Sequence, residues 1–557
     1  MPMRTAAPSL CRVLASSSLA SLLATLGCTA ALPPLTPPEA GGAPWREMVS
    51  KHVVLRTDRG DEDAREALVE LERAYVALHE IGFPQVKIEG SRIVVVHFDR
   101  ERDYLQVRPA GTAGVFSWKL PNDLSPEPTM IVWGKLDAPA RGTLLHEVTH
   151  MFVRSSLAEV PTWFNEGLAQ YYETLSVEDG SAIVGRPIRD MRAWARSEWT
   201  SERSGPFIQT KIPVGSVPSI EELVAMDAST FYVPGKDPNN PTLDELKKRS
   251  TSYVGAWGLV HLLMHDPAYQ PRLDAWMEQM SGGVPPRRAW TAAVAGLDAE
   301  AFETAYRQHM LNKFETMVLK TPYAHPDVTA EISRTMEPAE VHVLWARLRP
   351  WSGPHRAAAV ADLETAVTLA PSAAEPNFWS GLLRARSGDF AGAERSIEAA
   401  LAVSPDSSRY LQGLALVRSQ RADGKAPGSE EVKRADDTMG RLAKVASSGS
   451  ELNTVASHEA DRQRWDEALT FAQRAVKADP TCSQCFSTLA LALFTKLKFG
   501  DAVAAQQMAI SLLPDGVPAT KHEATLREYA EAARAHGANP SPAPAPSPAP
   551  ATSSGSP

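Results

Sequence analysis

The residues best suited to chemistry are His146, Glu147 and His150, which form an H-E-x-x-H pattern. On a helix, this spacing places the two imidazoles one turn apart on the same face. Two imidazoles so placed can bind one Zn²⁺, and the glutamate beside them can take a proton from an attacking water molecule. The pattern therefore predicts a hydrolytic zinc site, with His146 and His150 as ligands and Glu147 as the general base.

A catalytic zinc takes three protein ligands and keeps one position open. Glu166 follows His150 by 16 residues, in a second predicted helix whose first turn begins at Pro161. A turn over residues 157–160 would lay the two helices antiparallel and bring Glu166 to the metal. We predict one Zn²⁺ per chain, bound by His146, His150 and Glu166. The structural alternative is a pair of hydrogen-bonded core histidines and a surface glutamate.

Such a site also needs a hydrogen-bond donor opposite the metal, usually a tyrosine or a histidine. Tyr253 is the first candidate because it is the polar end of an apolar helix predicted over residues 253–263. His261 and His265 lie further along the same segment. A buried tyrosine with a purely structural hydrogen bond is the alternative.

These motifs together resemble the gluzincin metallopeptidases, and within them the peptidase-MA-like branch. The resemblance is carried by His146-Glu147-x-x-His150 and by Pro161-x-Trp163-x-x-Glu166-Gly167-x-Ala169, with a similar later segment at Tyr253-x-x-Ala256-Trp257. It implies an α+β, thermolysin-like zinc metallopeptidase domain over residues 45–325, with a small sheet and a helical lobe. The chain departs from thermolysin in the shorter gap before Glu166. It also has Gln170 where thermolysin-like enzymes have an acidic residue that orients a histidine.

The elements that must position the site begin with a small α/β unit over residues 45–140. Strands are predicted at 52–57, 92–98 and 130–133, and a helix at 61–81. We expect 130–133 to be the edge strand that pairs with an extended substrate, and an ordinary sheet strand is equally open. Residues 141–320 are predicted to be mainly helical, closing with a helix at 300–318.

The C-terminal part, residues 338–536, has the texture of an all-α tetratricopeptide solenoid. Pro371 and Pro405 are 34 residues apart, and so are Pro480 and Pro514. A 34-residue period with a closing proline is typical of tetratricopeptide repeats, which bury their apolar faces by stacking on one another. Residues 406–450 break the period, which indicates a degenerate repeat or an insertion. Residues 520–535 fit a capping helix, and the Pro/Ala/Ser-rich tail at 537–557 is predicted to be disordered.

The N-terminal segment indicates export. Residues 1–28 combine Arg4 and Arg12 with an apolar, uncharged run that ends at Cys28. We predict a lipoprotein signal with lipidation of Cys28, followed by a Pro/Ala-rich tether over 29–44. Ordinary signal cleavage, giving a periplasmic or secreted protein, is the alternative. The expected location is therefore the cell envelope, with membrane attachment only through that lipid.

The body of the chain contains only two cysteines, Cys482 and Cys485. A lone C-x-x-C lacks the second pair of a structural zinc site. Export would allow them to oxidise, but we interpret them as two small residues of a helix.

Composition excludes some classes of function. The 557 residues carry a net charge of -9 and no long basic run, so nucleic acid is not an expected partner. The leading hypothesis is an exported zinc metallopeptidase that acts on a peptide or protein and binds a protein partner through its repeats. The alternatives are a repeat scaffold or adaptor lipoprotein that binds zinc without turnover, and a zinc hydrolase acting on a non-peptide bond.

Overall fold

We describe the fold from a computed structural model. It describes residues 34–537 except for 87–91, 108–113, 118–119, 121, 125–126, 137, 158–159, 187–199, 205–206, 212–215, 233–241, 282–283, 285, 312–316, 324, 354 and 514–518. The predicted signal segment with Cys28, and all of the predicted tail but Gly537, lie outside the described residues. No helix within the described ranges combines the length and apolarity needed to cross a bilayer.

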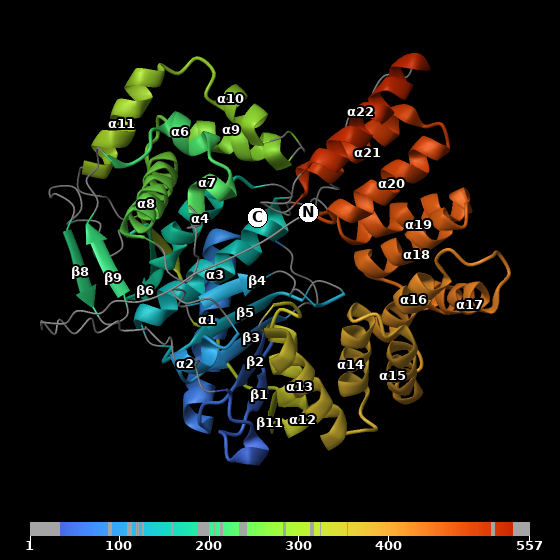
Figure 1. The fold of residues 1–557 in the computed structure, drawn as a ribbon. Coiled ribbons are helices and arrows are strands. Elements are labelled where there is room, and N and C mark those ends of the chain that lie inside the picture. The colour runs from blue at the N-terminus through green and yellow to red at the C-terminus, as the bar shows by residue number, and fades with distance from the viewer. Residues whose placement is uncertain are drawn as a thin grey trace, which may run out of the picture. The chain divides into compact units, whose positions relative to one another are not determined.

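A six-stranded mixed sheet, drawn as adjacent arrows in Figure 1, underlies the N-terminal part. Its order is β11-β1-β2-β3-β5-β4. The central strands β2, β3 and β5 run parallel, and β1, β4 and β11 each pair antiparallel with their neighbours. The strands are β1 (Arg46–Val49), β2 (Val53–Thr57), β3 (Ile93–Phe98), β4 (Gly114–Ser117), β5 (Thr129–Trp133) and β11 (Ile332–Thr335).

Both faces of this sheet are covered by helices, which is why its central strands are almost wholly apolar. Ile93, Val95 and Met130 on one face join the main core with α1 (Asp61–Gly82) and α3 (Ala138–Ser156). Val94 and Val96 on the other face pack with α12 (Pro338–Leu348), the first helix of the repeat region. Alternation of side chains along a strand produces the two separate cores.

The structure corrects two expectations about the sheet. The strand predicted at 130–133 exists as β5, but it lies between β3 and β4, so its assignment as the edge strand was wrong. The edge strand beside α3 is β4. Strand β11 was not predicted, and it pairs with β1 although it follows residue 325, where the metallopeptidase domain was expected to end.

A helical lobe follows α3. Its longest helix, α8 (Leu243–His265), begins at a capping box in which Thr242 and Glu245 bond each other's backbone amides. The closing helix predicted at 300–318 ends early, and 317–322 forms strand β10 instead. The other helices of the lobe are α4 (Thr162–Glu173), α6 (Ile220–Ala225), α7 (Ala228–Tyr232), α9 (Gln270–Ser281), α10 (Pro286–Ala293) and α11 (Ala299–Leu311).

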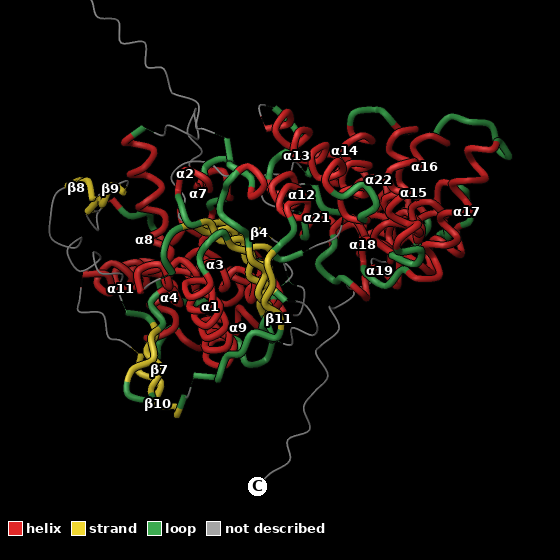
Figure 2. Tube along the Cα trace, turned by 90° about the horizontal axis from the view of Figure 1, so that it is seen from below, coloured by secondary structure: helices red, strands yellow, loops and turns green. Residues whose placement is uncertain are grey.

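Two small sheets accompany the lobe. In one, β7 (Ser181–Val184) pairs with β6 (Ser176–Glu178) and β10 (Met317–Pro322), and Figure 2 shows β7 and β10 apart from the main sheet. In the other, β8 (Thr200–Ser204) pairs with β9 (Phe207–Lys211). The remaining short elements are η1 (Pro38–Ala40) and α2 (Glu101–Tyr104).

The C-terminal part is a series of helix pairs of tetratricopeptide type, as predicted. Helices α14, α16, α18 and α20 begin at Ala374, Ser408, Gly449 and Ser483, so their starts are 34, 41 and 34 residues apart. The second interval confirms an insertion in the 406–450 repeat. The helices after α12 are α13 (His355–Leu369), α14 (Ala374–Arg386), α15 (Phe390–Val403), α16 (Ser408–Ala422), α17 (Glu430–Val445), α18 (Gly449–Asp461), α19 (Trp465–Ala478), α20 (Ser483–Thr495), α21 (Phe499–Ser511) and the capping helix α22 (Thr520–Ala535).

The first helices of successive pairs form one continuous face. Contacts link α12 to α14, α14 to α16, α16 to α18, and α18 to α20. We call this surface the first-helix face.

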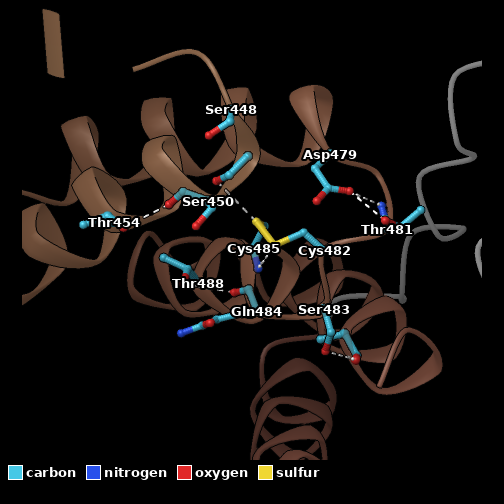
Figure 3. Close-up of a disulfide and its surroundings, with 12 residues drawn as sticks. Ser448, Ser450, Thr454, Asp479, Thr481, Cys482, Ser483, Gln484, Cys485 and Thr488 are labelled. Atoms are coloured by element: carbon cyan, nitrogen blue, oxygen red, sulfur yellow. Dashed lines mark hydrogen bonds between the residues drawn. A yellow bond between two sulfur atoms is a disulfide. The ribbon is translucent and has the colours of Figure 1, made fainter. Parts of the chain in front are cut away.

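A disulfide joins Cys482 and Cys485 where α19 leads into α20 (Figure 3), so the interpretation of these cysteines as unpaired was wrong. Cys482 is the N-cap residue of α20, and its sulfur accepts a hydrogen bond from the Cys485 amide. The sulfur of Cys485 contacts the carbonyl oxygen of Gly449 at 3.6 Å. Asp479 accepts hydrogen bonds from the amide and hydroxyl of Thr481 and orders the turn before the disulfide.

Candidate metal centre

Helix α3 is fixed by its apolar face. Leu144, Leu145, Val148 and Phe152 are buried in the main core, and the Phe152 ring lies 5.1 Å from that of Tyr75 on α1. Burying one face of the helix turns His146, Glu147 and His150 to the other side, where all three line a cleft.

Helix α4 is held by aromatic packing and by a close helix contact. Trp163 stacks on Trp276 at 5.3 Å, and Phe164 meets Trp276 edge-on at 4.8 Å. Gly167 lies against the backbone of α8, where a Cβ atom would come within 2.5 Å of the Ala256 carbonyl oxygen. Glu166 precedes this glycine, so the close approach of α4 to α8 sets where its carboxylate lies.

The three predicted ligands converge. Nε2 of His146 lies 3.3 Å from Oε2 of Glu166, and Nε2 of His150 lies 3.7 Å from Oε1 of the same carboxylate. One ligand atom from each residue lies within 4.8 Å of the other two. Across the described part of the chain, no other set of three His, Cys, Asp or Glu side chains meets this criterion.

The outer nitrogens of both imidazoles have partners that the sequence did not reveal. Nδ1 of His146 lies 3.3 Å from Oε2 of Glu173, and Nδ1 of His150 lies 3.0 Å from Oδ1 of Asn165. With a hydrogen on each Nδ1, the Nε2 atom of each ring keeps its electron pair, which a cation beside Glu166 could accept. Glu173, rather than Gln170, supplies the acidic partner, and its position seven residues after Glu166 on one helix was the available signal.

Electrostatics favour a cation at this point. Burial would lower the pKa of His146, but the nearby carboxylates of Glu166 and Glu173 raise it well above its usual value. Burial would raise the pKa of Glu166, but His150 and His146, with a hydrogen bond from Tyr232, lower it to about 2. Oε2 of Glu166 is a buried acceptor that receives no hydrogen bond in the structure. An ionised, buried carboxylate beside two imidazoles is a donor set that suits Zn²⁺.

Glu147 points to the edge strand. The backbone amide of Phe116 on β4 donates a hydrogen bond of 2.8 Å to its Oε2 atom. This bond fixes the carboxylate and leaves Oε1 as a further acceptor. It also shows that the outer edge of β4 faces the candidate metal centre.

Two tyrosines lie beside the ligands. Tyr253, the predicted donor, lines the cleft, and burial followed by the negative charge of Glu166 raises its pKa well above the usual value. It therefore stays protonated and able to donate. Tyr232, which was not predicted, donates a hydrogen bond of 2.7 Å to Oε1 of Glu166.

His261 and His265 do not line the cleft. His261 lies 2.8 Å from His309 and 2.9 Å from the carbonyl oxygen of Gly185, and His265 lies 3.0 Å from the hydroxyl of Tyr171. Their candidacy as donors at the metal centre is therefore wrong.

The cleft has a volume of about 790 Å³. Its walls come from α3, α4, the edge strand β4, Tyr232 and Tyr253, and from residues 510–513 at the end of α21. It is therefore large enough for several residues of an extended peptide.

Among the comparisons with known proteins, only the one with solved structures gave matches. No protein-family model matches the chain, and no curated protein matches it. Solved structures similar to it include TTC0263, a tetratricopeptide protein of Thermus thermophilus, at 18% identity over 35% of this chain and 96% of that one, with a TM-score of 0.28. YrrB, a tetratricopeptide protein with an unusual peptide-binding site, is 19% identical over 35% of this chain and 91% of its own, with a TM-score of 0.26. MamA is 17% identical over 29% and 88%, with a TM-score of 0.24.

Proposed function

We propose that the chain is a zinc-dependent peptidase. The observation that carries the proposal is the convergence of His146, His150 and Glu166 in a cleft that also holds Glu147. His146, His150 and Glu166 would hold one Zn²⁺. Zinc bound there would act as a Lewis acid toward a carbonyl oxygen and lower the pKa of water.

The protein's own groups would move the proton. Glu147, whose Oε2 atom is held by the Phe116 amide, would accept the proton of the attacking water at Oε1 and return it to the leaving amine. Tyr253 would donate a hydrogen bond to the oxygen on which negative charge develops. Tyr232 positions the Glu166 carboxylate through the bond to Oε1.

The substrate class follows from β4. An extended peptide can add to the outer edge of this strand through the backbone groups that neither β5 nor Glu147 occupies. Gly114, Val115 and Phe116 all line the cleft, so such a peptide would run past Glu147. We therefore propose peptide or protein substrates in preference to other acyl compounds.

The second candidate is a repeat scaffold that binds zinc without turnover. It is favoured by the helix pairs of tetratricopeptide type, which make up most of the chain after residue 338. In that case the zinc centre would serve only to order α3 and α4.

One experiment separates the candidates. The full chain and its Glu147→Gln variant are assayed for bound zinc by mass spectrometry and for cleavage of a broad peptide library. We expect one zinc in both proteins, with cleavage reduced by about 10²–10⁴-fold in the variant. Zinc without cleavage in the wild type would favour the scaffold. A wild type that binds no zinc would refute the metal centre.

A further inference from the structure

In the loop between β4 and β5, the described residues lie against the first-helix face of the repeats. They contact three of the five helices of that face. The side-chain amide of Asn122 donates 2.7 Å to the carbonyl oxygen of Arg349, the residue after α12. Arg386, the last residue of α14, donates 3.2 Å to the amide oxygen of Asn122. Ser450 on α18 donates 2.8 Å to the backbone carbonyl of Leu124.

The loop is held by charge as well. Nη2 of Arg347, on α12, lies 3.0 Å from Oδ2 of Asp123 and also pairs with Glu127. The side chains of Arg347 and Asp123 are only 8% and 5% exposed. A buried pair of this kind is specific, because removing either charge would leave the other one buried and less well paired.

Aromatic rings fix the arginines that face the loop. The guanidinium of Arg347 lies 4.8 Å from the centre of the Trp379 ring, and that of Arg386 lies 5.4 Å from the centre of the Trp351 ring. Stacking of this kind restricts an arginine to the orientation in which it meets a carboxylate or an amide. Leu124 adds an apolar contact with the repeat core. The surface thus offers basic, aromatic and apolar sites to a short acidic segment.

The loop is joined in sequence to strand β4, which lines the cleft. On one side it continues into β4, whose Phe116 amide bonds Glu147, and on the other into β5, which precedes α3. Displacement of the loop would therefore act on the edge strand beside Glu147, because the two are joined in sequence. The distance along the chain is short, since Ser117 and Leu120 are separated by two residues.

We propose that the repeats hold the described residues of the β4–β5 loop, Asn122 to Leu124 and Glu127, as an internal peptide ligand, and that an acidic partner peptide regulates the cleft by displacing them. The partner carries two carboxylates four residues apart, as Asp123 and Glu127 do, with an apolar residue between them. An internal ligand is present at high effective concentration, so the partner must bind the same face more tightly or in several copies. Only the effect on catalysis rests on the proposed peptidase function.

The test uses the full chain and a labelled peptide with the sequence of residues 119–128. Binding is measured by fluorescence anisotropy for three proteins: the wild type, the loop variant Asp123→Asn/Glu127→Gln, and Arg347→Gln, which changes the first-helix face. Because the loop variant weakens the internal competitor, we expect it to bind the peptide at least tenfold more tightly than the wild type. Arg347→Gln should bind at least tenfold more weakly than the loop variant. A peptide with Asn and Gln in place of Asp and Glu is the matched ligand control.

Hydrogen exchange provides a readout independent of activity. Amides of 114–117 should exchange at least threefold faster in the loop variant, and in the wild type at saturating peptide. Glu62→Gln/Glu66→Gln, which neutralises two exposed acids on α1, should change neither binding nor exchange. Equal peptide affinity in the wild type and the loop variant, or unchanged exchange at 114–117, would overturn the proposal. Both results can be obtained from a chain that cleaves nothing, so they do not depend on the peptidase assay.

Discussion

Oε2 of Glu173 lies 3.3 Å from Nδ1 of His146, and the other nitrogen of the same ring, Nε2, faces Glu166. The imidazole thus bridges two carboxylates, one expected to bind the metal and one that orients the ring. In metal centres, a partner of this kind fixes the tautomer and raises the basicity of the ligand.

The first prediction concerns this partner. Glu173→Gln should lower zinc affinity by about 10–100-fold, because the amide supports His146 less well than a carboxylate does. Competition with a chromophoric chelator measures the change. Gln170→Ala is the control, since the Nδ1 atoms of both histidines are paired with Glu173 and Asn165 instead, and it should alter affinity by less than about threefold. Equal affinities in the two variants would show that Glu173 has no such role.

The second prediction concerns Gly167. Gly167→Ala should destabilise the chain by about 1–3 kcal/mol, because the new methyl group would lie 2.5 Å from the Ala256 carbonyl oxygen and force α4 and α8 apart. Zinc affinity should fall as well, since Glu166 moves with α4. Gly440→Ala in α17 is the control, because nothing lies within 4 Å of the position that its Cβ atom would take. This variant should be more stable than the wild type by up to about 1 kcal/mol. Denaturant unfolding measures both.

The third prediction concerns acid. Burial lowers the pKa of His261 to about 3 and that of His265 to about 4, and it also lowers the pKa of His309. The charges facing this cluster are few, since Tyr171 is neutral and Asp266 acts mainly on His309. The folded chain therefore binds fewer protons than the unfolded chain below pH ~6.5. The stability that the folded state has from keeping these histidines neutral is complete above pH ~6.5. It is lost progressively as the pH falls toward about 4, the pKa of His265, and then about 3, the pKa of His261.

The measurement is the unfolding free energy between pH 7.5 and pH 5. Below pH ~6 each of these histidines should contribute a slope of up to about 1.4 kcal/mol per pH unit. His265→Phe removes one titrating group and keeps an aromatic ring against His261, so its slope should be smaller than that of the wild type. An identical slope in the variant would exclude His265 as a source of acid sensitivity.

The fourth prediction concerns the disulfide. Because it closes a ring of only four residues, its removal should cost about 2 kcal/mol at most. Cys482→Ser/Cys485→Ser should therefore lower the melting temperature slightly and leave zinc content unchanged. Alkylation of the unfolded, unreduced wild type, followed by peptide mass spectrometry, should find both cysteines unmodified. Alkylation of either residue would contradict the bond.

An element of this fold could be predicted from the sequence when its residue pattern extends over enough positions. The H-E-x-x-H helix, the apolar strand at Ile93–Phe98 and the 34-residue repeat period are regular over several residues, and the structure contains all three. Strand β4 has only four residues, and β11 has four exposed ones, so neither has a burial pattern that a sequence could reveal. Asn165 was missed because neither its type nor its spacing marks it as the partner of a histidine. Glu173 could have been found, because a residue seven positions after Glu166 lies on the same face of a helix.

The pairing of β11 with β1 determines where this chain can be divided. A fragment ending at residue 325 would lose β11 and leave β1 with an open row of amide and carbonyl groups. It would also lose α12 and expose the apolar residues Val94, Val96 and Ile131 to water. Such a fragment would associate with copies of itself through both surfaces. The N-terminal part therefore has to be produced together with the start of the repeats.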